Sequence, residues 1–239
     1  MRRLLLLTVA FVVAVIFGYW IPAIVRHFAR FGSVAHSLAR PGFCLVLFAL
    51  LFASPALRSQ FRVSWRWTWV LLIPLVFLGL NTASLFAHPP FFPAVLAAAL
   101  VLDGLAIGFM EEFLFRGVAF LGEPEASPKA TVFLSALVFS LLHLMGLTTG
   151  ADPHEVQRLV VFAFPAGITF GIIRMATGSI AWPVVLHGLI DATGYLAYPR
   201  AAPAGRLGAG LVAFSAVVTG VLFFVHPAMK PKRLTMRCS

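Results

Sequence analysis

The sequence predicts an all-α membrane protein, a polytopic bundle of about eight transmembrane helices that enclose a polar cavity. Of its 239 residues, 61% are hydrophobic and only 11% are charged, whereas about a quarter of the residues of a soluble domain are charged. Nearly uncharged windows of about 18 or more residues, long enough to cross a bilayer as helices, recur along the chain. The sequence has no evident internal repeat or soluble domain, so we expect residues 1–239 to form a single membrane domain.

Hydropathy divides the chain into its predicted spans. The first follows Met1-Arg2-Arg3; its apolar run of about 20 residues is too long for the core of a signal peptide, and no cleavage site follows it. The second is short and ends at Ser54-Pro55, where proline can bend a helix. The fourth is the longest. The eight predicted spans are 4–25, 42–57, 67–87, 91–120, 130–147, 157–176, 179–198 and 206–226.

The sixth span carries small residues at four-residue spacing, at Ala163, Gly167 and Gly171. Such a stripe lets one membrane helix approach another closely, so we interpret it as a packing surface. Other polar residues of the spans stand alone, and we interpret them as structural contacts between helices: Asn81, Asp103 and Arg174.

The net charge of +10 comes from basic residues spread through short loops and tails. This distribution favours a positive-inside bias over a nucleic-acid-binding face, so no nucleic-acid partner is expected. With both termini cytoplasmic, eleven Lys and Arg residues fall in cytoplasmic segments and six in external ones. The excess of arginine (15) over lysine (3) indicates a GC-rich genome, and the short chain indicates a prokaryote. We therefore expect a multi-pass protein of the prokaryotic cytoplasmic (inner) membrane with cytoplasmic N- and C-termini.

Three charged residues lie within six positions of the fourth span, at Glu111, Glu112 and Arg116. Each would cost roughly 2.5–3.5 kcal/mol at mid-bilayer if it stood alone. Glu112 and Arg116 are one helical turn apart and can pair directly. Glu111 points about 100° away from Glu112, so that pair does not neutralise it. The pair is either a structural staple or a support for catalysis, and Glu111 is a candidate catalytic group.

Two further spans carry protonatable residues at helical spacing. The fifth has Phe139 four residues before His143, and the seventh has His187 four residues before Asp191, one turn apart on one face. A lone histidine such as His143 often serves only as a helix contact. Acids and histidines on three separate spans, however, indicate shared chemistry more than independent structural roles.

Amide hydrolysis suits this set of residues. A carboxylate in a low-dielectric site can act as a general base on water, and a nearby histidine can share the proton. The developing oxyanion needs hydrogen-bond donors, which an imidazole or a protonated carboxyl can supply. The sequence therefore predicts Glu111 with His143 as the pair that activates water, and His187 with Asp191 as partners of the oxyanion and the substrate.

Other designs of intramembrane protease fit the sequence poorly. The segment His154-Glu155-Val156-Gln157-Arg158 departs from the zinc pattern H-E-x-x-H, because arginine replaces the second histidine. Asp103 and Asp191 lack the glycine-flanked context of the aspartyl type, and no serine stands in a nucleophile setting. Two histidines and a glutamate could in principle bind zinc. We nevertheless expect no cofactor and no metal.

The three motifs resemble those of the CPBP family of CAAX proteases and bacteriocin-processing enzymes, also called the ABI family. The family motif E-E-x-x-x-R corresponds to Glu111–Arg116, F-x-x-x-H to Phe139–His143, and H-x-x-x-N/D to His187–Asp191. Each motif alone is weak, but the three occur in the family order on predicted membrane helices. The resemblance covers about residues 100–195; the remaining spans match only in hydropathy.

The resemblance implies a glutamic intramembrane endopeptidase, an eight-helix bundle whose cavity opens towards the cytoplasm. It implies that Glu111 is the base that activates water, with His143 as its partner, and that His187 and Asp191 stabilise the oxyanion or place the scissile bond. It assigns supporting roles to three residues: Glu112, Arg116 and Phe139.

Asp191 departs from the best-studied prenyl-protein proteases of the family, which carry Asn at this position. Asp donates a hydrogen bond only when it is protonated; alternatively, ionised Asp191 charges and orients His187, whose N–H then serves the oxyanion. Both roles are open at the level of sequence.

The expected partners are the lipid bilayer and a membrane-associated protein or peptide substrate. Prenylated C-termini, bacteriocin leaders and C-terminal anchors are all substrates within the family, and the sequence does not choose among them or fix an oligomeric state. Two alternatives stand beside the protease. One is a catalytically divergent member that acts as a bacteriocin-immunity or scaffold protein. The other is a proton-coupled transporter, which would be expected to show paired broken helices.

Overall fold

The computed structural model describes residues 66–87, 89, 93–121, 127–197 and 205–229, the side chains of 205–212 excepted, and a few single positions between 12 and 58. Within these residues the regular structure is entirely helical, which confirms the all-α part of the predicted fold class. The first two predicted spans, 4–25 and 42–57, lie outside the described residues except for those single positions. The total of eight spans therefore stays a prediction.

Each of the other six predicted spans corresponds to a helix. Among the described residues, four helical stretches are long and apolar enough to cross a membrane, at 69–87, 94–120, 128–149 and 153–177. A fifth helix, α9, has 17 residues and the apolar part of α10 is shorter. The main helices are α5 (Leu72–Ala87), α6 (Ala94–Glu112), α7 (Pro128–Leu142), α8 (Pro153–Thr177), α9 (Ala181–Ala197) and α10 (Gly205–Val225).

Shorter helical turns extend several of these helices. The 3-10 turn η2 precedes α5, and α7 continues into the 3-10 helix η5. The π-helix η3 and the 3-10 turn η4 follow α6 without a break. The turn η7 follows α10. Their bounds are η2 Trp69–Leu71, η3 Phe113–Gly117, η4 Val118–Phe120, η5 His143–Thr149 and η7 Pro227–Met229.

Local sequence explains where α8 begins and ends. The carboxylate of Asp152 accepts hydrogen bonds from the backbone N–H groups of His154, at 2.7 Å, and Glu155, at 3.1 Å. Such a cap satisfies donors that the first turn of a helix leaves unpaired, and proline is well suited to the first helical position, here Pro153. The helix stops at Gly178, which has φ 72°, a left-handed conformation that glycine adopts without steric cost.

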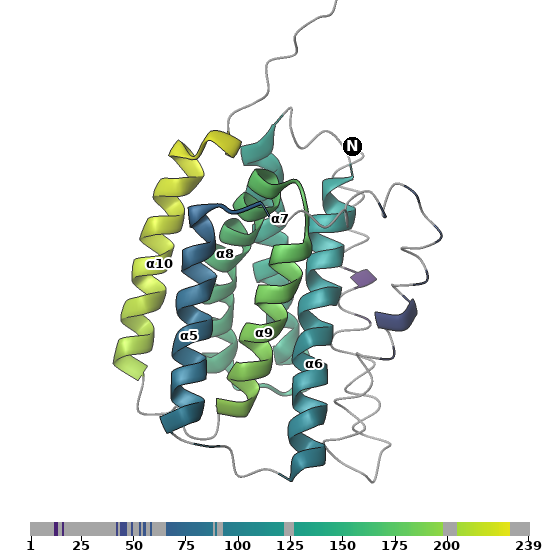
Figure 1. Cartoon of the computed structure of the whole chain (residues 1–239), viewed down its shortest axis with the longest axis vertical. Coiled ribbons are helices and arrows are strands. Elements are labelled where there is room, and N and C mark those ends of the chain that lie inside the picture. Colours follow the sequence, from purple (N-terminus) through teal and green to yellow (C-terminus); the bar gives the residue numbers. More distant parts are fainter. Residues whose placement is uncertain are drawn as a thin grey trace, which may run out of the picture.

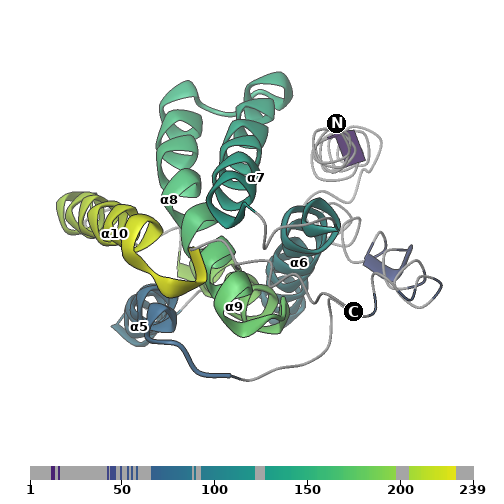
Figure 2. The ribbon, with the colours of Figure 1, turned by 90° about the horizontal axis from the view of Figure 1, so that it is seen from above.

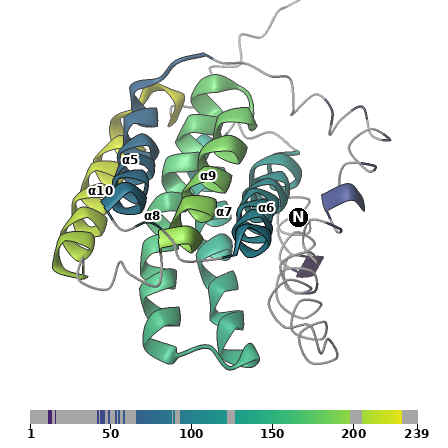
Figure 3. The ribbon, with the colours of Figure 1, turned by 60° about the horizontal axis from the view of Figure 1, so that its bottom comes forward.

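The helices form two closely packed pairs with two further helices beside them. Figures 1 and 2 show α6 next to α9 and α7 next to α8, with α5 and α10 along the side of α8 and α9. The N-terminal half of α8 and the C-terminal end of α7 extend beyond the rest of the bundle in Figure 3. The chain segment that links these two ends is η5.

The stripe of small residues predicted on the sixth span lies at the contact between α8 and α7. A Cβ atom on Gly167 would lie 3.0 Å from Cα of Ala136, and one on Gly171 would lie 2.7 Å from Val132. Ala163 is buried in the core. The packing interpretation of this stripe is confirmed.

A second close crossing joins α6 to α9. A Cβ atom on Gly108 would lie 2.5 Å from Cα of Gly188, and one on Gly104 would lie 2.6 Å from Cα of Ala192. Both glycines are therefore required for the backbones to touch. This crossing sets the C-terminal end of α6, with Glu111 and Glu112, against the middle of α9, with His187 and Asp191.

Asn81 connects α5 to α9, as expected of a structural contact. Its side-chain amide donates hydrogen bonds to the carbonyl of Ile190 at 3.1 Å and to Oγ1 of Thr193 at 3.3 Å. On the other side of α8, the hydroxyls of Thr169 and Thr219 share a hydrogen bond of 2.8 Å and connect α8 to α10. Paired polar groups of this kind hold membrane helices together.

Candidate active site

Glu112 and Arg116 form a fully buried ion pair. Nη1 of Arg116 donates to Oε1 of Glu112 at 3.0 Å, and both side chains have no exposed surface. Nη2 donates to the carbonyl of Gly167 at 3.0 Å, and the guanidinium lies 4.6 Å from the centre of the Phe139 ring. The predicted pairing of Glu112 with Arg116 is confirmed, and the pair is connected to α7 and α8.

Arg116 lies on the π-helix η3 rather than on a regular α-helix. A π-helix has a wider turn, is rare, and is frequently found at functional sites. The helix changes character directly after Glu112, so the second motif acid and the arginine stand on either side of this change. Hydropathy carries no signal for such a turn.

His187 is the centre of the polar cluster. Its Nδ1 lies 2.9 Å from Oε1 of Glu112, and its Nε2 lies 3.7 Å from Oε2 of Glu111 and 3.6 Å from Oδ2 of Asp191. The imidazole also stacks on Phe170, with ring centres 5.3 Å apart. The two longer distances exceed the usual length of a direct hydrogen bond and are electrostatic contacts between the imidazole and the carboxylates.

The contact between His187 and Glu112 adds to the predicted arrangement. Sequence reasoning placed His187 with Asp191, one turn away, and placed Glu112 only with Arg116. In the structure Oε1 of Glu112 accepts hydrogen bonds from both Nη1 of Arg116 and Nδ1 of His187. A carboxylate accepts hydrogen bonds, so Nδ1 of His187 carries a proton and is the donor.

His143 lies where α7 passes into η5. Its Nδ1 is 3.0 Å from the carbonyl oxygen of Phe139, and a carbonyl can only accept, so Nδ1 carries the proton. In a neutral ring, Nε2 is then a hydrogen-bond acceptor. The Phe139 ring meets the imidazoles of His143 and His187 edge-on, with centres 5.1 and 6.0 Å away. Phe139 thus contacts both histidines and also Arg116.

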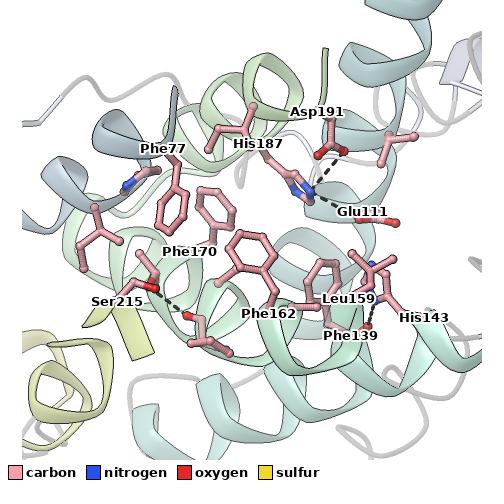
Figure 4. Close-up of a pocket in the computed structure, with 18 of the residues that line it drawn as sticks. Phe77, Glu111, Phe139, His143, Leu159, Phe162, Phe170, His187, Asp191 and Ser215 are labelled. Carbon is pink, nitrogen blue, oxygen red and sulfur yellow. Dashed lines mark hydrogen bonds and ion pairs between the residues drawn. The ribbon is translucent and has the colours of Figure 1, made fainter. Parts of the chain in front are cut away.

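All four predicted catalytic residues line one internal cavity of about 340 Å³. Figure 4 shows His187, Asp191, Glu111 and His143 at one side of this cavity, with aromatic side chains beside them. The side chains of Glu111, His143 and His187 are buried, and that of Asp191 is 25% exposed. The structure therefore brings together residues from α6, η5 and α9 that are up to 80 positions apart.

The cavity is less polar than the sequence predicted. Glu112 and Arg116 are absent from its wall, and most of the other lining residues are apolar. The aromatic part of the wall consists of Phe77, Phe139, Phe162, Phe170 and Tyr195. Away from the four polar residues, Thr169 and Ser215 add hydroxyl groups. The cavity thus has an ionisable end and a largely hydrophobic remainder.

Gly104, Gly108 and Gly188 are residues of the site that sequence reasoning missed. They carry no chemistry, but they allow the backbones of α6 and α9 to touch and so bring Glu112 within hydrogen-bonding distance of His187. The signal was available, because Gly104 and Gly108 have the spacing of the small-residue motif of membrane helices. Asp103, interpreted as structural, is buried and does not line the cavity.

The fold and this cluster define a class of protein: a helical membrane protein whose carboxylates and imidazoles meet at an internal cavity. Residues 92–193 match the family model described as Type II CAAX prenyl endopeptidase Rce1-like, which represents a family of proteases. The match contains all three motifs and confirms the resemblance to the CPBP family of CAAX proteases. It covers less than half of the chain. No curated protein and no solved structure matches the chain.

Proposed function

We propose that the protein is a glutamic intramembrane endopeptidase that hydrolyses a peptide bond of a membrane-associated protein or peptide. The observation that carries the proposal is the separation of the two motif acids. Glu112 is buried against Arg116, while Glu111 lines the cavity together with His143, His187 and Asp191. One carboxylate is therefore available for chemistry, and the other supports the site.

The first step of the proposed reaction is activation of a water molecule. Glu111 accepts a proton from water, and Nε2 of His143 accepts the second hydrogen of that water as a hydrogen bond. The oxygen then adds to the carbonyl carbon of the scissile peptide bond. Because Nδ1 of His143 donates to the Phe139 carbonyl, its ring is already oriented for this role.

The second step is cleavage of the tetrahedral intermediate. His187 acts as an imidazolium with a proton on each ring nitrogen, and its Nε2–H donates to the oxyanion while the C–N bond breaks. Glu111 returns its proton to the leaving amine. A carboxylic acid and an amine are the products, and no covalent enzyme intermediate forms. His187 can hold this position because Nδ1 is fixed by Glu112.

Of the two roles open to Asp191, we propose that it orients His187 as an ionised carboxylate. Its Oδ2 lies 3.6 Å from Nε2, the nitrogen that faces the cavity, and it is more exposed than the other members of the cluster. A nearby carboxylate favours the ring that carries a proton on Nε2. The oxyanion donor is then the imidazole and not Asp191 itself.

The substrate that fits the cavity is an apolar segment. The family description names a prenyl endopeptidase for CAAX sequences, and a hydrophobic wall beside the ionisable end suits a prenyl group or an apolar side chain. We propose that the protein works in a prokaryotic cytoplasmic membrane with both termini in the cytoplasm. In a bacterium that lacks protein prenylation, an unprenylated membrane-bound peptide takes the place of the CAAX substrate.

The test is a cleavage assay with the purified full chain in liposomes. The probes are a fluorogenic peptide with a farnesylated CAAX terminus, the same peptide without farnesyl, and the membrane peptidome of the host. Glu111→Gln should reduce cleavage at least about 100-fold, the usual contribution of a general base. Glu155→Gln, an exposed acid outside the cavity, is the matched control and should retain activity.

Two further outcomes decide the mechanism and the class. A strong chelator should leave the activity unchanged; its loss, with recovery on adding zinc, would show a metal-dependent reaction. If Glu111→Gln cleaves as fast as the wild type, the base is another group. If the wild type yields no product that is absent from Glu111→Gln membranes, the chain is not a protease.

A further inference from the structure

Two side chains from neighbouring helices hold consecutive backbone carbonyls of the π-helix. Oγ of Ser135, on α7, donates to the carbonyl of Phe115 at 2.7 Å, and Nε of Arg174, on α8, donates to the carbonyl of Arg116 at 3.3 Å. Ser135 is 2% exposed and Arg174 is 8% exposed. Neither residue lines the cavity or belongs to the three motifs.

The conformation of this π-helix determines where the guanidinium of Arg116 lies. From its place on η3, Arg116 reaches Glu112 and Gly167 at the same time, at 3.0 Å each. A regular α-turn would keep residue 116 on the face of Glu112 but at a different rotation about the helix axis, because the two helices have different numbers of residues per turn. The backbone of η3 thus fixes the position of Arg116, which is the first member of a series of contacts that runs from Arg116 through Glu112 to His187.

The same series of contacts ends at the ionisable end of the cavity. Oε1 of Glu112 is shared by Arg116 and Nδ1 of His187, and Nε2 of His187 faces Glu111 and Asp191. A displacement of Arg116 changes the distance between its positive charge and Oε1 of Glu112. It therefore changes the strength of the hydrogen bond from Nδ1 of His187 to Oε1, which orients the imidazole.

We propose that Ser135 is a positioning residue of the active site, with Arg174 as a second support on the next carbonyl. The hydroxyl of Ser135 holds η3 in its wide turn, and through Arg116 and Glu112 it sets the orientation of His187. The guanidinium of Arg174 also lies 5.9 Å from the ring centre of Phe120, on the turn η4 that directly follows the π-helix. The activity arm of the test below rests on the proposed protease function; the spectroscopic arm does not.

The chain offers a matched control on the same helix. Oγ of Ser140 donates to the carbonyl of Val160 at 2.7 Å, which is a hydrogen bond of the same length from a buried serine of α7 to a backbone carbonyl. Its acceptor lies on α8, away from η3. Ser135→Ala and Ser140→Ala therefore remove equivalent hydrogen bonds, and only the first touches the π-helix.

The experiment compares the two variants in liposomes with the farnesylated probe, alongside thermal unfolding of each protein. We expect Ser135→Ala to lower kcat about ten-fold with KM within about two-fold, and Ser140→Ala to leave both constants within about two-fold. Both should lower the melting temperature to a similar extent. Equal kcat values in the two variants would overturn the proposal. If Ser135→Ala does not fold, Arg174→Lys replaces it, with the same expected loss of kcat.

A spectroscopic readout separates this inference from the proposed function. In protein labelled with ¹⁵N-histidine, the Nδ1–H signal of His187, assigned by its loss in His187→Gln, should shift in Ser135→Ala and not in Ser140→Ala. An unchanged signal in Ser135→Ala contradicts the positioning role even if the wild type is an active protease. A shifted signal in a chain without protease activity supports the positioning role and refutes only the proposed reaction.

Discussion

Nδ1 of His187 donates a hydrogen bond to Oε1 of Glu112 at 2.9 Å, and this single contact joins the first and third motifs across 75 residues of sequence. The same oxygen pairs with Arg116. Glu112 therefore has two cationic or donor partners and no place in the cavity wall, whereas its neighbour Glu111 lines the cavity. Adjacent acids thus have different tasks, and variants at each should fail in different ways.

Glu112→Gln should damage stability more than Glu111→Gln does. The substitution leaves the guanidinium of Arg116 fully buried without its carboxylate, and breaking a buried ion pair typically costs about 3–5 kcal/mol. The free energy of unfolding in mild detergent measures the effect. Glu155→Gln interrupts an exposed pair with Arg158 and should leave stability unchanged within error. Equal losses for Glu112→Gln and Glu155→Gln would contradict the buried pair.

His143→Ala should abolish cleavage in the liposome assay while the protein remains folded. The ring accepts the hydrogen bond from the attacking water through Nε2, and alanine leaves no acceptor there; the expected loss of kcat is about 100-fold or more. His154→Ala, at an exposed position near the start of α8, is the control and should retain wild-type kcat. Full activity of His143→Ala would remove this residue from the mechanism.

Asp191→Asn distinguishes the two roles of this position. If ionised Asp191 orients His187, the amide loses the charge, and kcat should fall about ten-fold or more with KM little changed. If instead a protonated Asp191 donates to the oxyanion, Asn supplies an equivalent donor and kcat is preserved. Measured kcat and KM of this variant, with the farnesylated and unmodified probes, therefore decide between them.

Gly108→Ala should separate α6 from α9. Its Cβ would lie 2.5 Å from Cα of Gly188, so the backbones must move apart, at a cost of about 1–3 kcal/mol or more. We expect lower stability and a loss of cleavage, because the bond between Glu112 and His187 depends on this approach. Gly220→Ala on α10 is the control: nothing lies within 4 Å of its Cβ, and alanine there should stabilise the helix by about 0.5–1 kcal/mol.

Phe77→Ala should change which substrates are accepted. Phe77 on α5 meets Phe162 on α8 edge-on, with ring centres 5.5 Å apart, and both line the cavity. Removing the ring enlarges the hydrophobic part, so the ratio of kcat/KM for a peptide with Trp over one with Ala near the cleavage site should rise about ten-fold or more. Phe86→Ala, at an exposed position of the same helix, should leave that ratio unchanged.

Local helical geometry made part of the site predictable. Residues four apart face the same side of a helix, which predicted the pair of Glu112 with Arg116. Neighbouring residues diverge by about 100°, which predicted that Glu111 would face elsewhere. The small residues of α8 followed from the same periodicity. Each of these predictions depends on one helix and needs no knowledge of its neighbours.

Contacts between helices and changes of helix type were beyond the sequence patterns that we used. The bond from His187 to Glu112 depends on how closely α6 and α9 cross, and so on three glycines acting together. The π-helix after Glu112 depends on side chains of α7 and α8 that hold its carbonyls. The hydrophobic wall of the cavity is contributed by several helices, so no single span reveals it.

The touching backbones of α6 and α9 also restrict how a substrate can enter. If these two helices separated to admit a substrate, the hydrogen bond between Glu112 and His187 would break, and the site would lose its geometry as the substrate entered. We therefore expect a peptide to enter past the other walls of the cavity, on α5 or α8, while α6 and α9 stay in contact. A cross-link between α6 and α9 should leave turnover intact, whereas one between α5 and α8 should trap the enzyme closed.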